Sequence, residues 1–250
     1  MATSFWHAGK LAIAGFLDLD LTHGQVHYAR FLKLHVDSGT RWLDVGCGRQ
    51  VVPEFAMTAE EQEALVSRAS FLAGVDVDPA IREHPLLTAR VIALGGSLPF
   101  APDSFDLVTA NMVVEHVSIP VAFLKDVYRV LRPSGRFVFH TPNYLYYLVR
   151  IASVTPKRVK NRIVRLLELR RDEDIFETFY RLNTERTIRE FARSAGFEVE
   201  TLMIKGSIGS LGRLGFLGWM ECFVLKLLAV VQHGRFNSNL IVSLKKPAEP

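Results

Sequence analysis

The stretch LDVGCG at 43–48 ends an apolar run in an acid and a glycine turn. Gly46 and Gly48 let a backbone approach a bound ligand closely, although a glycine pair is equally compatible with a plain strand-to-helix turn. A second apolar run ends at Asp76, and a carboxylate there can accept hydrogen bonds from both hydroxyls of a ribose. The third glycine of a dinucleotide fingerprint is missing, no P-loop pattern is present, and Asp44 would repel a phosphate. These residues therefore favour a nucleoside-like ligand without a pyrophosphate.

Short apolar, β-branched runs alternate with helical patterns from residue 41 onward. This order predicts an α/β fold: a Rossmann-like, doubly wound, mostly parallel seven-stranded sheet with helices on both faces and a helical insertion after the fifth strand. We expect strands at 41–45, 71–76, 90–93, 105–110, 136–140, 197–203 and 239–245. We expect helices at 22–36, 120–131 and 157–170, and one from an N-cap at Thr184 to a C′ residue at Gly196. Ligands of such folds bind beyond the carboxyl ends of the strands.

The composition indicates one globular unit, because 49% of the 250 residues are apolar and 22% are charged, which excludes intrinsic disorder. No internal repeat or low-complexity linker divides the chain. We expect a single domain over 1–250. Its expected parts are an N-terminal helical segment at 1–40, a ligand-binding core at 41–143, a helical insertion and cap at 144–196, and C-terminal strands and a helix at 197–250.

Four motifs occur in a specific order and spacing. They are LDVGCG at 43–48, GVDVDP at 74–79, LPFAPDSFDLV at 98–108, and VVEHV at 113–117 followed by LKDVYRVLRPSGRFVF at 124–139. Each motif alone is weak, but the ordered set over about residues 40–145 resembles class I S-adenosylmethionine (SAM) dependent methyltransferases, in the small-molecule methyltransferase-like, type 11 group. The resemblance implies SAM as the methyl donor and S-adenosylhomocysteine (SAH) as the product.

The same resemblance implies a role for each matching residue. Its cofactor-binding set is Asp44, Gly46, Cys47, Gly48, Asp76, Val77, Ser97, Leu98 and Asn111. Asp76 would hold the ribose hydroxyls, Val77 would pack on the adenine, and Ser97 and Leu98 would border the adenine on its other side. The backbone of Asn111 would lie near the methionine end. This sequence departs from the family where Gln50 replaces a frequent third glycine. It also lacks the acid that often precedes LPF and bonds the adenine amino group.

Methyl transfer from a sulfonium mainly requires alignment of the acceptor, and a base is needed only when the acceptor must lose a proton. We take His116 as the candidate base, because imidazole titrates near neutrality; the alternative is a histidine that only packs beside the pocket. His140, inside a strand pattern, is expected to be structural. The candidate acceptor-side residues are Glu115, Asn143, Tyr144, Tyr180 and Arg181. No metal site is expected, since the two cysteines lack ligand spacing.

The charge is concentrated in one segment. Residues 150–171 carry eight Lys or Arg against one acid, so the net charge of +4 leaves about −3 for the rest. The segment falls in the insertion over the acceptor side, and a basic amphipathic helix there can be a solvated face, a peripheral contact with an anionic membrane, or a site for another anionic partner. The apolar run 214–231 can contact the same membrane, or be a core helix or a dimer contact.

The leading hypothesis is O-methylation of a small molecule, a glycan or a lipid-linked intermediate. The competing hypothesis is a non-catalytic protein of the same fold that binds SAM or a nucleotide in a regulatory or scaffolding role. A nucleic-acid substrate is disfavoured by the faintly acidic body, and a homodimer stays open. The cysteine usage and the lack of a convincing export signal favour a cytoplasmic protein, with peripheral contact to the inner face of the membrane as an option.

Overall fold

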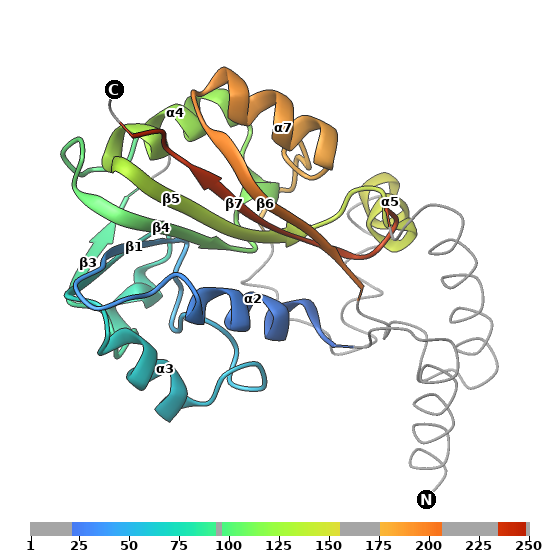
Figure 1. Cartoon of the computed structure of the whole chain (residues 1–250). Helices are drawn as coiled ribbons and strands as arrows, with labels where there is room; N and C mark the ends of the chain where they lie inside the picture. Colours follow the sequence, from blue (N-terminus) through green and yellow to red (C-terminus); the bar gives the residue numbers. More distant parts are fainter. Residues whose placement is uncertain (1–21, 94–96, 156–175, 207–234, 249–250) are drawn as a thin grey trace, which may run out of the picture.

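The computed structural model describes residues 22–93, 97–155, 176–206 and 235–248 (Figure 1). These residues form a seven-stranded sheet in the order β3-β2-β1-β4-β5-β7-β6. The strands are β1 (Arg41–Val45), β2 (Phe71–Asp76), β3 (Ala89–Ile92), β4 (Phe105–Asn111), β5 (Leu131–Pro142), β6 (Glu198–Lys205) and β7 (Asn239–Lys245). Strands β1 to β5 pair in parallel, and β7 runs antiparallel between β5 and β6. The predicted doubly wound, mostly parallel sheet is confirmed.

Helices cover both faces of this sheet. The described helices are α2 (Gly24–Lys33), α3 (Ala59–Val66), α4 (Pro120–Val130), α5 (Tyr147–Val154) and α7 (Glu185–Ser194), with 3-10 turns η1 (Pro79–Glu83) and η2 (Val114–His116). Figure 1 shows α2 and α3 on one face, α4 and α7 on the other, and α5 beyond the end of β5. The carboxyl ends of the parallel strands therefore meet at the edge where α5 and η2 lie.

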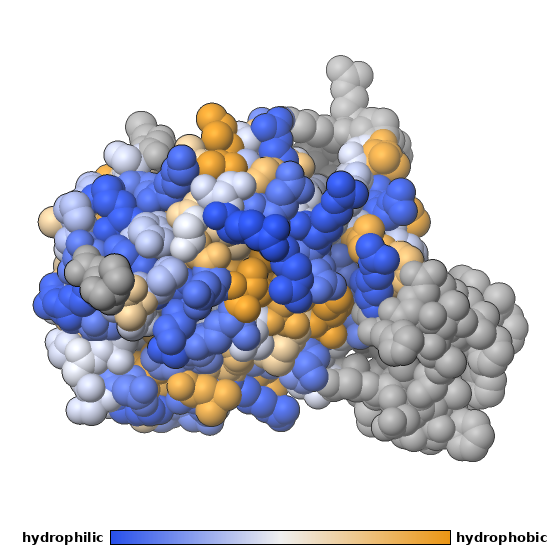
Figure 2. All heavy atoms as spheres, turned by 45° about the horizontal axis from the view of Figure 1, so that its top comes forward, coloured by the Kyte–Doolittle hydropathy of each residue, from blue (hydrophilic) through white to orange (hydrophobic). Residues whose placement is uncertain are grey.

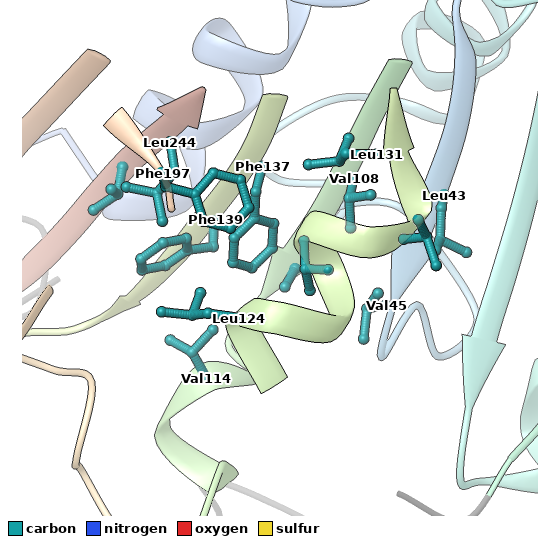
Figure 3. Close-up of a cluster of buried hydrophobic side chains, with 14 of the residues drawn as sticks. Leu43, Val45, Val108, Val114, Leu124, Leu131, Phe137, Phe139, Phe197 and Leu244 are labelled. Atoms are coloured by element: carbon teal, nitrogen blue, oxygen red, sulfur yellow. The ribbon is translucent and has the colours of Figure 1, made fainter. Parts of the chain in front are cut away.

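Successive side chains of a strand point to opposite faces of the sheet, and a separate hydrophobic core lies on each face. Trp42 packs with α2 and α3, whereas its neighbour Leu43 packs with α4 and α7. Figure 3 shows the second core, in which Leu124 of α4 lies against Phe137 and Phe139 of β5. The outward side of the layer that carries α4 and α7 is mostly hydrophilic, with separate small hydrophobic patches (Figure 2). These helices are therefore amphipathic, and the buried sheet holds the loops at its carboxyl edge in place.

Local signals place the helix ends. Thr184 is the N-cap of α7, accepting from the backbone N–H of Thr187, and Gly196 follows the helix with φ +93°. Both predicted positions are confirmed. Helix α2 is shorter than the expected 22–36. It begins where the His23 side chain accepts from the N–H of Gln25 and ends at Lys33.

Strand β5 begins earlier than expected. We predicted a strand at 136–140, but β5 runs from Leu131, which pairs with Phe105 before the register shifts. The expected helix 157–170, most of the basic segment and the run 214–231 lie outside the described residues. Among the described helices, none combines the length and apolar character needed to cross a bilayer.

Candidate functional site

The loop after β1 is held tightly against the two neighbouring strands. The N–H of Gly46 donates to the Val75 carbonyl at 2.7 Å, and the N–H of Gly48 donates to Asp76 Oδ2 at 2.8 Å. Both glycines lie in the left-handed region, with φ +66° and +52°. A Cβ on Gly46 would come within 2.4 Å of Val113 Cγ2. The first glycine is thus required by packing.

The second glycine faces open space beside a carboxylate. Within the described part of the chain, a Cβ on Gly48 would meet no atom within 4 Å. Asp76 accepts from the N–H of Gly48 through Oδ2 and from that of Asp78 through Oδ1, at 2.8 and 2.9 Å. Each oxygen keeps lone-pair capacity for a further donor, such as a ribose hydroxyl. Val77, next to the carboxylate, is 42% exposed and offers an apolar surface.

Cys47 lies beneath the turn. Its side chain is buried, and a Cβ on Gly74 would lie only 2.6 Å from Cys47 Sγ. Burial, reinforced by the nearby carboxylates of Asp44 and Asp76, raises the pKa of the thiol far above its ordinary value. The side chain is therefore a packing group, and only the backbone of Cys47 can line a ligand.

Asp44 is a buried acid at the end of β1. Its Oδ1 accepts from Thr109 Oγ1 at 2.6 Å, and Thr109 in turn accepts from Trp42 Nε1 at 2.7 Å. Burial raises the pKa of Asp44 to about 7; the Thr109 hydrogen bond opposes that rise, and the charge of Asp76 adds to it. The edge therefore contains a carboxyl group that titrates near neutrality, which suits a cationic ligand better than a phosphate.

The connection after β3 borders the same space. The N–H of Ala93 donates to the Asp76 carbonyl at 3.0 Å, Ser97 is exposed, and Leu98 is buried in the core that includes Val45. These contacts bring Ser97 and Leu98 to the Asp76 side of the site, so the two residues border the space beside that carboxylate.

Asn111, at the end of β4, belongs to a network with α2. Its Nδ2 donates to Gln25 Oε1 at 2.9 Å, and its Oδ1 lies 2.9 Å from His140 Nδ1. His140 Nε2 lies 3.0 Å from Asn239 Oδ1, and burial, the main cause, lowers the pKa of His140 to about 4. His140 is therefore a buried neutral group, as expected for a structural histidine. The side chain of Asn111 is used within the protein, which leaves its backbone for a ligand.

His116 lies on η2, directly after the loop that follows β4. Its Nδ1 lies 2.7 Å from the carbonyl oxygen of Glu177. Its ring packs edge-on against that of Phe176, with 5.9 Å between the ring centroids. A carbonyl oxygen can only accept, so Nδ1 carries the proton. In the neutral ring the lone pair then lies on Nε2, which is the tautomer that a general base needs.

Glu115 fastens the chain segment 176–183 to η2. Its carboxylate is buried and accepts from Thr141 Oγ1 at 2.9 Å, and Thr141 accepts from Asn183 Nδ2 at 2.7 Å. The carbonyl oxygen of Glu115 also accepts the N–H groups of Phe179 and Tyr180, at 2.8 and 3.1 Å. Glu115 thus holds segment 176–183 in place, and this segment forms a wall beside His116.

Three other predicted acceptor-side residues gather around this wall. The rings of Tyr144 and Tyr180 lie 5.7 Å apart, and Tyr180 has φ +52°, an uncommon conformation for a non-glycine residue. Arg181 donates to the Ser118 carbonyl at 2.6 Å. Asn143 differs, because its buried Nδ2 donates to the backbone carbonyls of residues 235 and 237 and thus fixes the chain there.

Sequence reasoning missed several residues that support the site. They come from elements distant in sequence and are Gln25, Tyr28, Thr109, Asp126, Arg129, Thr141, Glu177 and Asn183. Polar side chains inside otherwise apolar runs, such as Thr109 in β4, are the only signal that could have identified some of them. Among the described residues, no group of three or more His, Cys, Asp or Glu is arranged to hold a metal ion.

Comparison with known proteins identifies a family for this chain. A family model described as a methyltransferase domain matches residues 23–202. The ubiquinone biosynthesis O-methyltransferase of Idiomarina loihiensis is 32% identical over 128 residues, which cover 45% of this chain and 47% of that protein. The chain thus matches about half the length of this relative.

Two solved structures share the fold. An S-adenosylmethionine dependent methyltransferase from Mesorhizobium loti is 18% identical with a TM-score of 0.54, covering 92% of this chain and 99% of its own. The cyclase SpnF is 16% identical with a TM-score of 0.53, covering 90% of this chain and 82% of its own. At these identities the likeness concerns the fold alone.

Proposed function

This chain belongs to the methyltransferase-domain family of SAM-dependent enzymes, and from that membership we propose that it methylates a hydroxyl oxygen on a small-molecule or lipid-linked acceptor. The observation that carries the proposal is the 2.7 Å hydrogen bond between His116 Nδ1 and the Glu177 carbonyl. It holds the neutral imidazole in the tautomer whose Nε2 can take a hydroxyl proton. The relative named as an O-methyltransferase supports oxygen as the acceptor atom.

The residues at the donor side fit SAM. When bound, SAM supplies a methyl group already activated on a positively charged sulfur. Asp76 would accept from the ribose hydroxyls, Val77 would pack on the adenine, and the backbone around Gly48 would line the methionine half. The space beside Gly48 and the two carboxylates at this edge suit a nucleoside that carries positive charge.

The acceptor side favours an apolar acceptor over a glycan. Phe176 and Phe179, on the segment held by Glu115, are 49% and 37% exposed, and the Tyr144–Tyr180 pair lies in the same region. On α5, the exposed Ile151 adjoins the exposed Arg150. Aromatic and aliphatic surfaces bind planar rings and alkyl tails, whereas sugars require more polar partners. This surface supports an aromatic or lipid-linked hydroxyl compound.

A transfer assay tests this proposal. The chain is incubated with SAM labelled on its methyl group and with catechol, a catechol that carries a long alkyl tail, or a methyl glycoside. We expect labelled ether to form with the catechols, faster with the tailed one, and not with the glycoside. Methylation of the glycoside in preference to both catechols would contradict the acceptor class.

The non-catalytic alternative predicts a different result. A cyclase shares this fold at low sequence identity, so the fold alone does not establish methyl transfer. A chain that binds SAH but transfers no label to any acceptor or cell extract would support a regulatory or scaffolding role.

We expect Asp44 to make the affinity for SAH dependent on pH. Its raised pKa of about 7 keeps the folded carboxyl largely protonated below that pH and ionised above it. A ligand with an ammonium group favours the ionised form, so affinity should rise from pH 6 to pH 8 and then level off. Titration calorimetry across this range measures the effect, and Asp44→Asn should show a flat profile. Parallel profiles for the two proteins would mean that Asp44 only orients the turn.

A further inference from the structure

Two side chains of α4 fix the chain on the far side of Asp76. Asp126 accepts from the backbone N–H of Leu98 through Oδ2. Arg129 donates from Nη2 to the Leu98 carbonyl at 2.9 Å and from Nη1 to the Phe100 carbonyl at 2.6 Å. The two side chains also bind each other, Arg129 Nε to Asp126 Oδ1 at 2.9 Å. This ion pair joins residues one turn apart on α4, and together they hold the N–H and the carbonyl of Leu98 and the carbonyl of Phe100.

The clamped segment lies where the nucleoside end of the donor would be. The N–H of Ala93 donates to the Asp76 carbonyl, and the buried Leu98 packs in the same core as Val45 and Val75, near the ends of β1 and β2. The space that Asp76 faces is therefore bordered on one side by the backbone near Leu98. Because the carboxylate of Asp126 is mostly buried and its bonds are charge-assisted, the position of this backbone is well defined.

The backbone near Leu98 is the expected source of contacts with the adenine. No acidic side chain precedes Leu98 to bond an adenine amino group, since the chain reads Ala93-Leu94-Gly95-Gly96-Ser97. We therefore expect backbone groups and packing to supply most of the affinity at that end, and their placement depends on what holds them.

We infer that Asp126 and Arg129 are positioning residues for the cofactor, which hold the backbone at Leu98 and Phe100 against the adenosine half of SAM. The inference rests on the proposed placement of the donor at this edge. It assigns a donor-side role to two polar residues of α4 that do not themselves touch the ligand. The ion pair acts through the backbone, so its loss should weaken every ligand that carries adenosine and leave the transfer step unchanged.

The test compares Arg129→Gln with a matched control, Arg132→Gln. Arg132 also pairs with an acid, Asp106 at 3.0 Å, and also donates to a backbone carbonyl, but that carbonyl belongs to Asp103 and not to residues 97–100. Calorimetry gives the dissociation constants for SAH and for 5′-methylthioadenosine, which lacks the amino-acid end. We expect Arg129→Gln to weaken both ligands by the same factor of about ten, and Arg132→Gln to weaken neither.

Kinetics separates positioning from catalysis. For Arg129→Gln the KM for SAM should rise by a similar factor, with kcat at saturating SAM and the acceptor KM unchanged. Asp126→Asn keeps an acceptor for the Leu98 N–H but loses the charge, so the same pattern should appear with a smaller factor. It replaces Arg129→Gln if that variant fails to fold.

Three results would overturn the inference. The first is unchanged affinity for both ligands in the folded variants. The second is a loss confined to SAH, which would place the effect at the amino-acid end. The third is an equal loss in Arg132→Gln. A wild-type chain that binds neither ligand would instead overturn the placement of the donor, and with it this inference.

Discussion

Gly46→Ala is expected to destabilise the fold and abolish SAH binding. The new Cβ would lie 2.4 Å from Val113 Cγ2, and the residue would have to keep φ +66°. Strain and overpacking together should lower the free energy of unfolding by about 2 to 5 kcal/mol. Denaturant unfolding measures this loss, and calorimetry with SAH measures binding.

Gly48→Ala and Gly39→Ala serve as matched controls. All three glycines have positive φ, but a Cβ on Gly48 or Gly39 meets no described atom within 4 Å. Each control should lose only about 1 to 2 kcal/mol from backbone strain. Gly48→Ala should nevertheless weaken SAH, because its methyl group enters the space beside Asp76, while Gly39→Ala should bind normally. Normal SAH binding by Gly48→Ala would show that the ligand does not lie over this loop.

His116→Gln is expected to lower kcat by a factor of about 10² to 10⁴, the usual contribution of a general base. Glutamine can still donate to the Glu177 carbonyl, so the wall beside it should persist while the base is lost. The affinity for SAH should not change.

His35→Gln is the matched control for this variant. His35 Nδ1 also lies near a backbone carbonyl, that of Phe31 at 2.9 Å, but His35 lies close to the amino-terminal ends of the strands, away from η2. It should keep full activity. Wild-type turnover in His116→Gln would leave His116 as a packing residue and would require a different base or an acceptor that needs none.

The fold was largely predictable because its signals are local. The apolar runs that became β1 and β2 have the predicted bounds, and Thr184 and Gly196 mark the ends of α7 through their own side chain and backbone preferences. The start of β5 was missed because Leu131 pairs with Phe105, a contact that no local pattern encodes. Tertiary pairing thus extended the strand into residues that have no local strand pattern.

The site was predictable where a motif specifies backbone geometry and less so where side chains meet across the fold. The turn at Gly46 and Gly48 and the carboxylate of Asp76 lie together as expected. Asn111 was expected for its backbone alone, yet its side chain pairs with Gln25, 86 residues earlier. Such a contact depends on where α2 packs against the sheet. The sequence pattern of α2 predicts a helix but not its position.

We propose that Asp76 and the glycine loop bind SAM at the carboxyl edge of the sheet. The most direct measurement is calorimetric titration of the wild-type chain and of Asp76→Ala with SAH. We expect saturable binding at a single site in the wild type and binding weaker by at least about tenfold in the variant, because ribose hydrogen bonds to a carboxylate are lost. Absence of binding to the wild type, or equal affinity in the two proteins, would contradict it.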